Sequence, residues 1–219
     1  MIKETFNLII LDKSGSMSSI KNATLSGVNE TIGTIRSSGR QTGITQLLTL
    51  VSFCSCNIDY IYNNVDIEEV KALTQNDYNP CCCTPLYDTI GSCCTRLKQQ
   101  IGNREDIAVS VTIITDGYEN ASHEWSAMSV KQLIESLKAE GWMFAYIGAN
   151  QDVEKVSFSI AIDNTMEFNA TEEDTREMFR RERESRSSWV NRVKSAANIS
   201  ACINLNNNYF TPKKKPTGK

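Results

Sequence analysis

Short apolar runs alternate along the chain with segments whose apolar residues recur at helical spacing. Apolar runs predict strands at residues 6–11, 45–53, 107–115 and 142–147, and two shorter, more polar segments at 57–62 and 165–168 are expected to pair beside them. Four segments predict helices, at residues 18–37, 85–101, 128–139 and 152–160. Because strands and helices alternate, we expect a three-layer, doubly wound α/β fold with a mostly parallel sheet. The short turn before residue 57 predicts one antiparallel strand at an edge.

The C-terminal part of the chain has a different composition. Residues 171–197 predict a highly charged helix that begins at a capping residue, Thr171. Its apolar residues lie toward its two ends and leave a charged centre at 180–186, so we expect packing on the sheet by those ends. The domain organisation follows as 1–170 for the α/β domain, 171–200 for a charged helix packed on it or appended to it, and 201–219 for a strand or tail with a flexible, basic end.

Composition narrows the function. A 219-residue chain with 40% hydrophobic residues can bury one sizeable core. The net charge of -3 gives no basic footprint for nucleic acid, and the basic tail is typical of a solvated terminus. The N-terminal segment lacks the features of a signal peptide, and no apolar run reaches the length of a membrane span. We therefore expect a cytoplasmic protein with no membrane or nucleic-acid partner.

Oxygen-bearing side chains follow the predicted strands where these strands end. Asp12 follows the first strand, and Ser14 and Ser16 come next at one-residue gaps on a turn; Asp116 ends the strand at 107–115, and Thr84 stands at a helix entrance. The carboxyl ends of parallel strands gather at one edge of a sheet, where ligands bind. Hard oxygen ligands suit Mg²⁺, with Mn²⁺ or Ca²⁺ as alternatives, and disfavour Zn²⁺.

Three motifs in this setting resemble a known family. The sequences DKSGSM at 12–17, TPL at 84–86 and TDG at 115–117 resemble the metal-ion-dependent adhesion site of von Willebrand factor A domains. The expected order of strands and helices from about residue 5 to 168 is similar as well. The resemblance implies a VWA-type, Rossmann-like sheet with a divalent metal at its upper edge.

The resemblance also implies how such a site works. Ser14, Ser16 and Thr84 would coordinate the metal directly, and Asp12 and Asp116 would act largely through water. The last coordination position would take an Asp or Glu from a partner protein. Intracellular members often work beside ATPases or in assemblies, so the expected function is metal-dependent protein binding within an assembly, not catalysis.

Two neighbouring segments belong to the expected site region. Tyr118, Glu119 and Asn120 follow Asp116 and are either a partner-binding rim or solvated loop residues. Three cysteines, residues 81–83, precede Thr84, where the resemblance leads us to expect small, glycine-like residues. The role of these cysteines is open.

Other interpretations of the same residues compete with this one. The DKSGSM segment alone also fits a serine-rich turn and helix cap. A metal-dependent phosphoester hydrolase would use Asp12 as nucleophile, but Ser14 stands where a second acid is expected. A serine hydrolase is disfavoured because the GxSxG motif is absent and the single histidine, His123, lies in a polar segment.

The eight cysteines are expected to be reduced thiols. A zinc site formed by Cys54, Cys56 and the cluster at 81–83 is an alternative. Their spacing does not match paired C-x₂-C motifs, so the sequence favours incidental thiols over zinc ligands.

Overall fold

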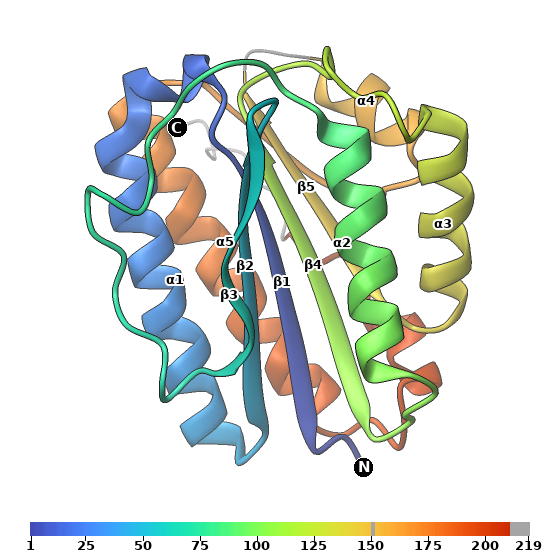
Figure 1. The fold of residues 1–219 in the computed structure, drawn as a ribbon. Helices are drawn as coiled ribbons and strands as arrows, with labels where there is room; N and C mark the ends of the chain where they lie inside the picture. The colour runs from blue at the N-terminus through green and yellow to red at the C-terminus, as the bar shows by residue number, and fades with distance from the viewer. Residues whose placement is uncertain (150–151, 211–219) are drawn as a thin grey trace, which may run out of the picture.

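The computed structural model describes residues 1–149 and 152–210, and within them one six-stranded sheet has helices on both faces (Figure 1). The strands are β1 (Glu4–Asp12), β2 (Thr45–Cys54), β3 (Asn57–Asp66), β4 (Ile107–Thr115), β5 (Met143–Ala149) and β6 (Asn164–Phe168). Their spatial order is β3-β2-β1-β4-β5-β6, and only β3 is antiparallel to its neighbour. This confirms the fold class and the antiparallel edge strand.

Helices cover the two faces of the sheet separately. The helical segments are η1 (Gly15–Ile20), α1 (Lys21–Thr42), α2 (Leu86–Ile101), α3 (Ala127–Ala139), α4 (Val153–Ser159), α5 (Glu172–Val193) and η2 (Ser200–Leu205), of which η1 and η2 are 3₁₀. Helices α1 and α5 lie on one face, and α2 and α3 lie on the other (Figure 1). Among the described residues, no helix is both long and apolar enough to span a bilayer.

Strand β1 is buried on both faces, as its continuous apolar run predicts. Leu8 and Ile10 pack in the core beneath α2 and α3, whereas Ile9 and Leu11 pack beneath α1 and α5. Each fully buried aliphatic side chain contributes roughly 1.5–3 kcal/mol to stability. The strand that carries Asp12 at its end is therefore held firmly at the centre of the molecule.

Two charged residues in the centre of α5, Glu182 and Arg186, are buried, which corrects the expectation that this helix packs by its ends alone. Arg186 has no exposed surface and donates hydrogen bonds to Asn7 Oδ1 and Thr112 Oγ1, both at 2.8 Å. Glu182, one turn earlier, pairs with Arg186 at 2.7 Å and accepts a hydrogen bond from Tyr209 at 3.1 Å. Helical periodicity places both charges on the face that also carries the apolar residues of the helix.

Of the two alternatives expected for the segment after α5, a strand or a tail, the strand does not form within the described residues. The chain from Ser200 to Leu205 forms η2, and no strand follows in 206–210; residues 211–219 lie outside the described part. The backbone of this segment forms local hydrogen bonds and not strand pairing. The Cys202 amide, for example, donates to the Ile199 carbonyl at 2.9 Å. Asn206 then fixes the segment, since it accepts from the Trp189 indole at 3.0 Å.

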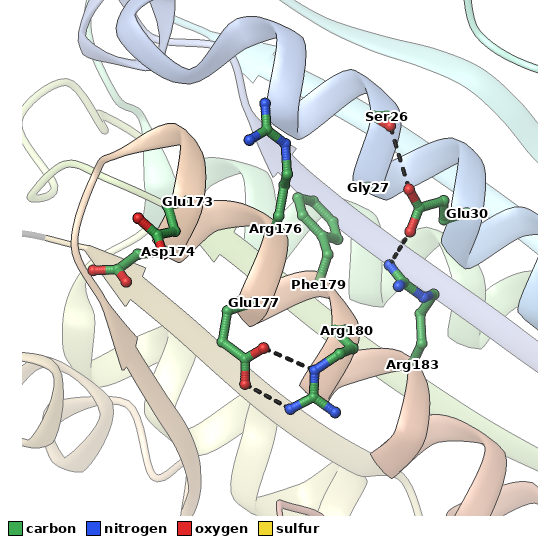
Figure 2. A pocket seen from close by; sticks show the side chains of 10 residues that line it. All are labelled: Ser26, Gly27, Glu30, Glu173, Asp174, Arg176, Glu177, Phe179, Arg180 and Arg183. Atoms are coloured by element: carbon green, nitrogen blue, oxygen red, sulfur yellow. Dashed lines mark hydrogen bonds and ion pairs between the residues drawn. The ribbon is translucent and has the colours of Figure 1, made fainter.

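Helices α1 and α5 approach each other closely at a glycine. Figure 2 shows the Phe179 ring of α5 directed toward Gly27 of α1. A Cβ atom on Gly27 would lie 2.1 Å from a ring carbon of Phe179, a side chain that is almost fully buried. An ion pair between Arg183 and Glu30, at 2.7 Å, lies beside this contact. Contact between these helices therefore requires a residue without a side chain at position 27.

We expect Gly27→Ala to lower the free energy of unfolding by about 1–3 kcal/mol, because the added methyl group must displace a buried ring. Gly33→Ala, in the same helix, is the matched control. No atom lies within 4 Å of its added Cβ, so the gain in helix propensity should raise stability by about 0.5–1 kcal/mol. Urea denaturation measures both; equal effects would contradict the close approach.

The buried ion pair on α5 allows a second test. Arg186→Met should lower the free energy of unfolding by about 3–5 kcal/mol, because it leaves the Glu182 carboxylate buried without its partner. Arg180→Met, which removes an exposed arginine from the same helix, should have a much smaller effect. Comparable losses in the two variants, measured by denaturant titration, would show that the pair does not hold α5 to the sheet.

Candidate metal centre

The parallel pairing of β1 with β4 brings the ends of both strands together. The register pairs Leu11 with Ile114, so Asp12 and Thr115 become neighbours. Thr115 Oγ1 donates to Asp12 Oδ2, and the Ser14 amide donates to Asp12 Oδ1, both at 2.6 Å. The Asp12 carboxylate is fully buried and thus fixed in orientation.

The other four expected metal ligands gather around Asp12. The hydroxyl oxygens of Ser14 and Ser16 lie 3.2 Å apart, and Ser16 donates to Asp116 Oδ1 at 2.6 Å. A Cβ atom on Gly117 would lie 3.2 Å from Thr84 Oγ1 and 3.9 Å from both Asp12 Oδ2 and Ser14 Oγ. The glycine therefore leaves a small space lined by oxygens from three loops. The structure brings all five residues together.

Hydrogen bonds join these three loops. The Asn120 side chain accepts from the Thr84 amide at 2.8 Å. The Gly15 amide donates to the Cys82 carbonyl at 3.0 Å. The Tyr78 hydroxyl donates to the Asp12 carbonyl at 2.6 Å. The positions of the oxygen side chains thus depend on contacts between segments that are distant in the sequence.

The site holds two carboxylates without a cationic partner. Burial raises the pKa of Asp12 to about 6, although the hydrogen bonds to its carboxylate act in the opposite direction. Burial also raises the pKa of Asp116. Within residues 1–149 and 152–210, no lysine or arginine forms an ion pair with either group, and the buried Lys13 pairs with Asp59 instead. Removing carboxylates from water is unfavourable unless positive charge compensates them. The residues present therefore fit a hard divalent cation.

The expected rim residues have different structural roles. Tyr118 is 52% exposed, and its hydroxyl accepts from the Asp152 amide at 3.0 Å. The Glu119 carboxylate accepts backbone hydrogen bonds, including one from Ala121 at 2.8 Å, and Asn120 holds Thr84. Of the three, Tyr118 offers an exposed aromatic surface, whereas Glu119 and Asn120 build the loop.

Sequence reasoning missed two residues that position the site. Thr115 orients Asp12, and its place directly before Asp116 was a signal that it reaches the same strand end. Tyr78 donates to the Asp12 carbonyl from the long loop before α2, and nothing in its sequence context indicated this contact.

The local geometry disfavours a nucleophilic Asp12. Both of its carboxylate oxygens accept hydrogen bonds, and the side chain has no exposed surface. His123 is exposed, and its backbone amide donates to Asp88. Neither residue is placed as a catalytic group.

Comparison with known proteins identifies the fold. No protein-family model and no curated protein sequence matches this chain. Proximal thread matrix protein 1 from the mussel byssus is similar over 82% of this chain and 45% of its own, with 12% identity and a TM-score of 0.54. Its second crystal form gives 93% and 48%, 15% identity and a TM-score of 0.56. This chain thus spans about half the length of the mussel protein.

A second structural relative is the manganese-loaded TRAP protein of Plasmodium vivax. The likeness covers 77% of this chain and 69% of that one, with 14% identity and a TM-score of 0.50. At such identities the likeness shows the fold alone. The chain has an α/β fold of the von Willebrand factor A type.

Metal binding is expected to stabilise the folded domain. Mg²⁺ at a hundredfold excess over its Kd should raise the free energy of unfolding by about 2.7 kcal/mol. Ser14→Ala and Asp116→Ala should lose this increase, whereas Ser18→Ala, which alters an exposed serine of η1, should retain it.

Without metal, in EDTA, Asp12→Asn should have a free energy of unfolding at least as high as that of the wild type, because it removes a buried charge.

Thermal and urea unfolding with and without Mg²⁺ measure these effects. Full stabilisation of Asp116→Ala by Mg²⁺ would exclude the oxygen cluster as the binding site.

Proposed function

We propose that this chain is an adhesion-type protein-binding module that uses a divalent cation, preferably Mg²⁺, to bind a partner. The observation that carries the proposal is the pair of buried carboxylates, Asp12 and Asp116, that lack a cationic partner among the described residues and face clustered hydroxyls. The VWA-type fold supports the same interpretation, because its sheet brings both carboxylates to one edge.

The hydroxyl and carboxylate residues would coordinate the ion in different ways. Ser14, Ser16 and Thr84 would provide neutral hydroxyl oxygens, and Asp12 and Asp116 would act through water. A cation bound mainly by neutral oxygens retains positive charge and attracts an anionic oxygen from outside. Ser16 is exposed, so the site opens to solvent at this residue. A carboxylate of an Asp or Glu on a partner protein is the ligand that this chemistry favours.

The rim determines which partner fits. Tyr118 follows Asp116 by two residues and is 52% exposed, and tyrosine is enriched among residues that dominate binding energy at protein interfaces. An acidic residue of the partner would bind the metal, and the partner residues next to it would pack on the Tyr118 ring. We propose a cytoplasmic setting and a partner such as an ATPase or another component of an assembly.

The proposal is tested by capture of partners from a lysate of the source cell. The wild type should retain a specific protein in Mg²⁺ and release it in EDTA, and Asp116→Ala should not retain it in either condition. Substitution of the critical Asp or Glu in that partner should abolish capture. Equal capture in all conditions would contradict metal-dependent binding.

Tyr118→Ala tests the contribution of the rim to partner binding independently of metal binding. This variant should bind the captured partner at least about fivefold more weakly, because an interface anchor is worth more than about 1 kcal/mol. Its stabilisation by Mg²⁺ should equal that of the wild type. Ser18→Ala is the control, and it should match the wild type in both measurements.

A further inference from the structure

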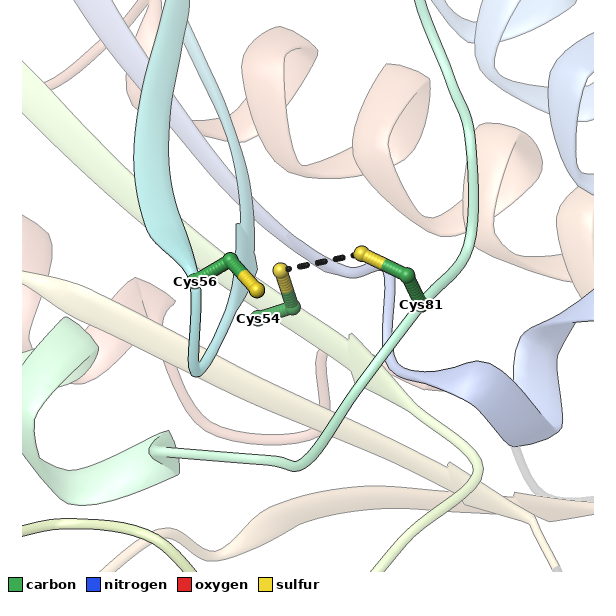
Figure 3. Close-up of side chains that lie close together, drawn as sticks. All are labelled: Cys54, Cys56 and Cys81. Carbon is green, nitrogen blue, oxygen red and sulfur yellow. Dashed lines mark hydrogen bonds between the residues drawn. The ribbon is translucent and has the colours of Figure 1, made fainter.

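Four thiols lie together beside the oxygen cluster. Cys54 ends β2, Cys56 lies in the turn to β3, and Cys81 belongs to the loop before Thr84 (Figure 3). Cys82 follows Cys81 in the same loop. The sulfurs of Cys54 and Cys81 are 3.5 Å apart, and those of Cys56 and Cys82 are 3.0 Å apart. The sulfurs of Cys54, Cys56 and Cys81 all lie within 4.8 Å of one another.

These separations fit the coordination of one metal ion. In a tetrahedral zinc site with Zn–S bonds of about 2.3 Å, neighbouring sulfurs are about 3.8 Å apart. The separations among Cys54, Cys56 and Cys81 exceed this value by about an ångström at most. The Cys82 sulfur contacts Cys56 but lies outside this set of three, so its loop would shift to bring it to the metal. All four cysteines are free thiols. Soft thiolates select Zn²⁺ over Mg²⁺, so this cluster and the oxygen cluster favour different metals.

The surroundings suit thiolate ligands. Backbone amides of Cys56 and Asn57 donate to the Cys54 sulfur, and the cationic Lys13 lies near it. Such donors stabilise sulfur that carries negative charge and orient it toward a metal. A hairpin turn thus supplies two thiols from positions that are separated by a single residue.

The backbone of Cys82 provides a further argument. Its φ angle is +62°, in the left-handed region that glycine adopts readily and other residues adopt at a cost of about 1–2 kcal/mol. The resemblance to von Willebrand factor A domains leads us to expect a small, glycine-like residue in this loop, and the structure has a cysteine at such a backbone position. A thiol that contacts Cys56 accounts for cysteine there despite the strain.

We infer that Cys54, Cys56, Cys81 and Cys82 form a zinc site that is separate from the oxygen site. Zinc would join the β2–β3 hairpin to the loop that carries Thr84. These segments are already hydrogen-bonded, since the Ser55 amide donates to the Cys83 carbonyl at 2.9 Å. The metal would strengthen this contact and fix the loop that contributes one ligand to the oxygen cluster. Zinc binding itself does not depend on the proposed protein-binding function.

The test is the zinc content and cobalt spectrum of the full chain, purified in a reductant that does not bind metal. The wild type should contain about one Zn²⁺ per chain, and Co²⁺ should give the sulfur-to-metal charge-transfer bands of a tetrahedral thiolate site. Cys56→Ser and Cys81→Ser should reduce the zinc content to near zero. Both positions are exposed, so these variants should fold, as circular dichroism can verify.

Two controls define the site. Cys83→Ser alters the adjacent exposed cysteine, whose sulfur has no sulfur contact within the described residues, and it should retain zinc. Asp116→Ala should also retain zinc, because it alters only the oxygen cluster. The inference is overturned if the reduced wild type binds no zinc, if Cys83→Ser loses as much zinc as Cys56→Ser, or if zinc is lost in Asp116→Ala but kept in the cysteine variants.

Discussion

The parallel pairing of β1 with β4 is the constraint on which the candidate metal centre depends. The chain leaves β1 toward β2 and β3, then returns across the sheet to place β4 on the other side of β1. The direction of winding reverses between these strands, and the crevice outside their carboxyl ends is where such sheets bind ligands. Asp12 and Asp116 lie close together there because the register of β1 and β4 makes the two strands end side by side. A shift in this register would separate the two carboxylates.

The close placement of Asp12 and Asp116 lowers the stability of the folded domain when no cation is bound. Two carboxylates lie at a largely buried edge, and burial raises the pKa of both. The surrounding scaffold must therefore be stable enough to hold them. Burial of the central strands contributes to that stability. The Arg186 network anchors α5 to Asn7 and Thr112 of the two central strands. Packing thus maintains a site whose own electrostatics are unfavourable without metal.

The sequence predicted the central strands β1, β2, β4 and β5 well because they are largely apolar runs followed by polar residues. It predicted the candidate ligands because Asp12 and Asp116 each follow such a run. It did not predict the burial of Glu182 and Arg186, because charged residues are expected at the surface unless their partner is known. The contact of Tyr78 with Asp12 was likewise invisible, since 66 residues separate them.

The thiol cluster shows a different limit of sequence reasoning. The search for paired C-x₂-C motifs assumes that each segment presents its ligands on one standard turn, and neither segment here has that spacing. The β2–β3 turn brings Cys54 and Cys56 together across one residue, and the loop brings adjacent cysteines toward them. Only the tertiary contact between hairpin and loop creates the cluster. The same loop then reaches Thr84, so sulfur and oxygen groups of opposite metal preference are held by one segment of chain.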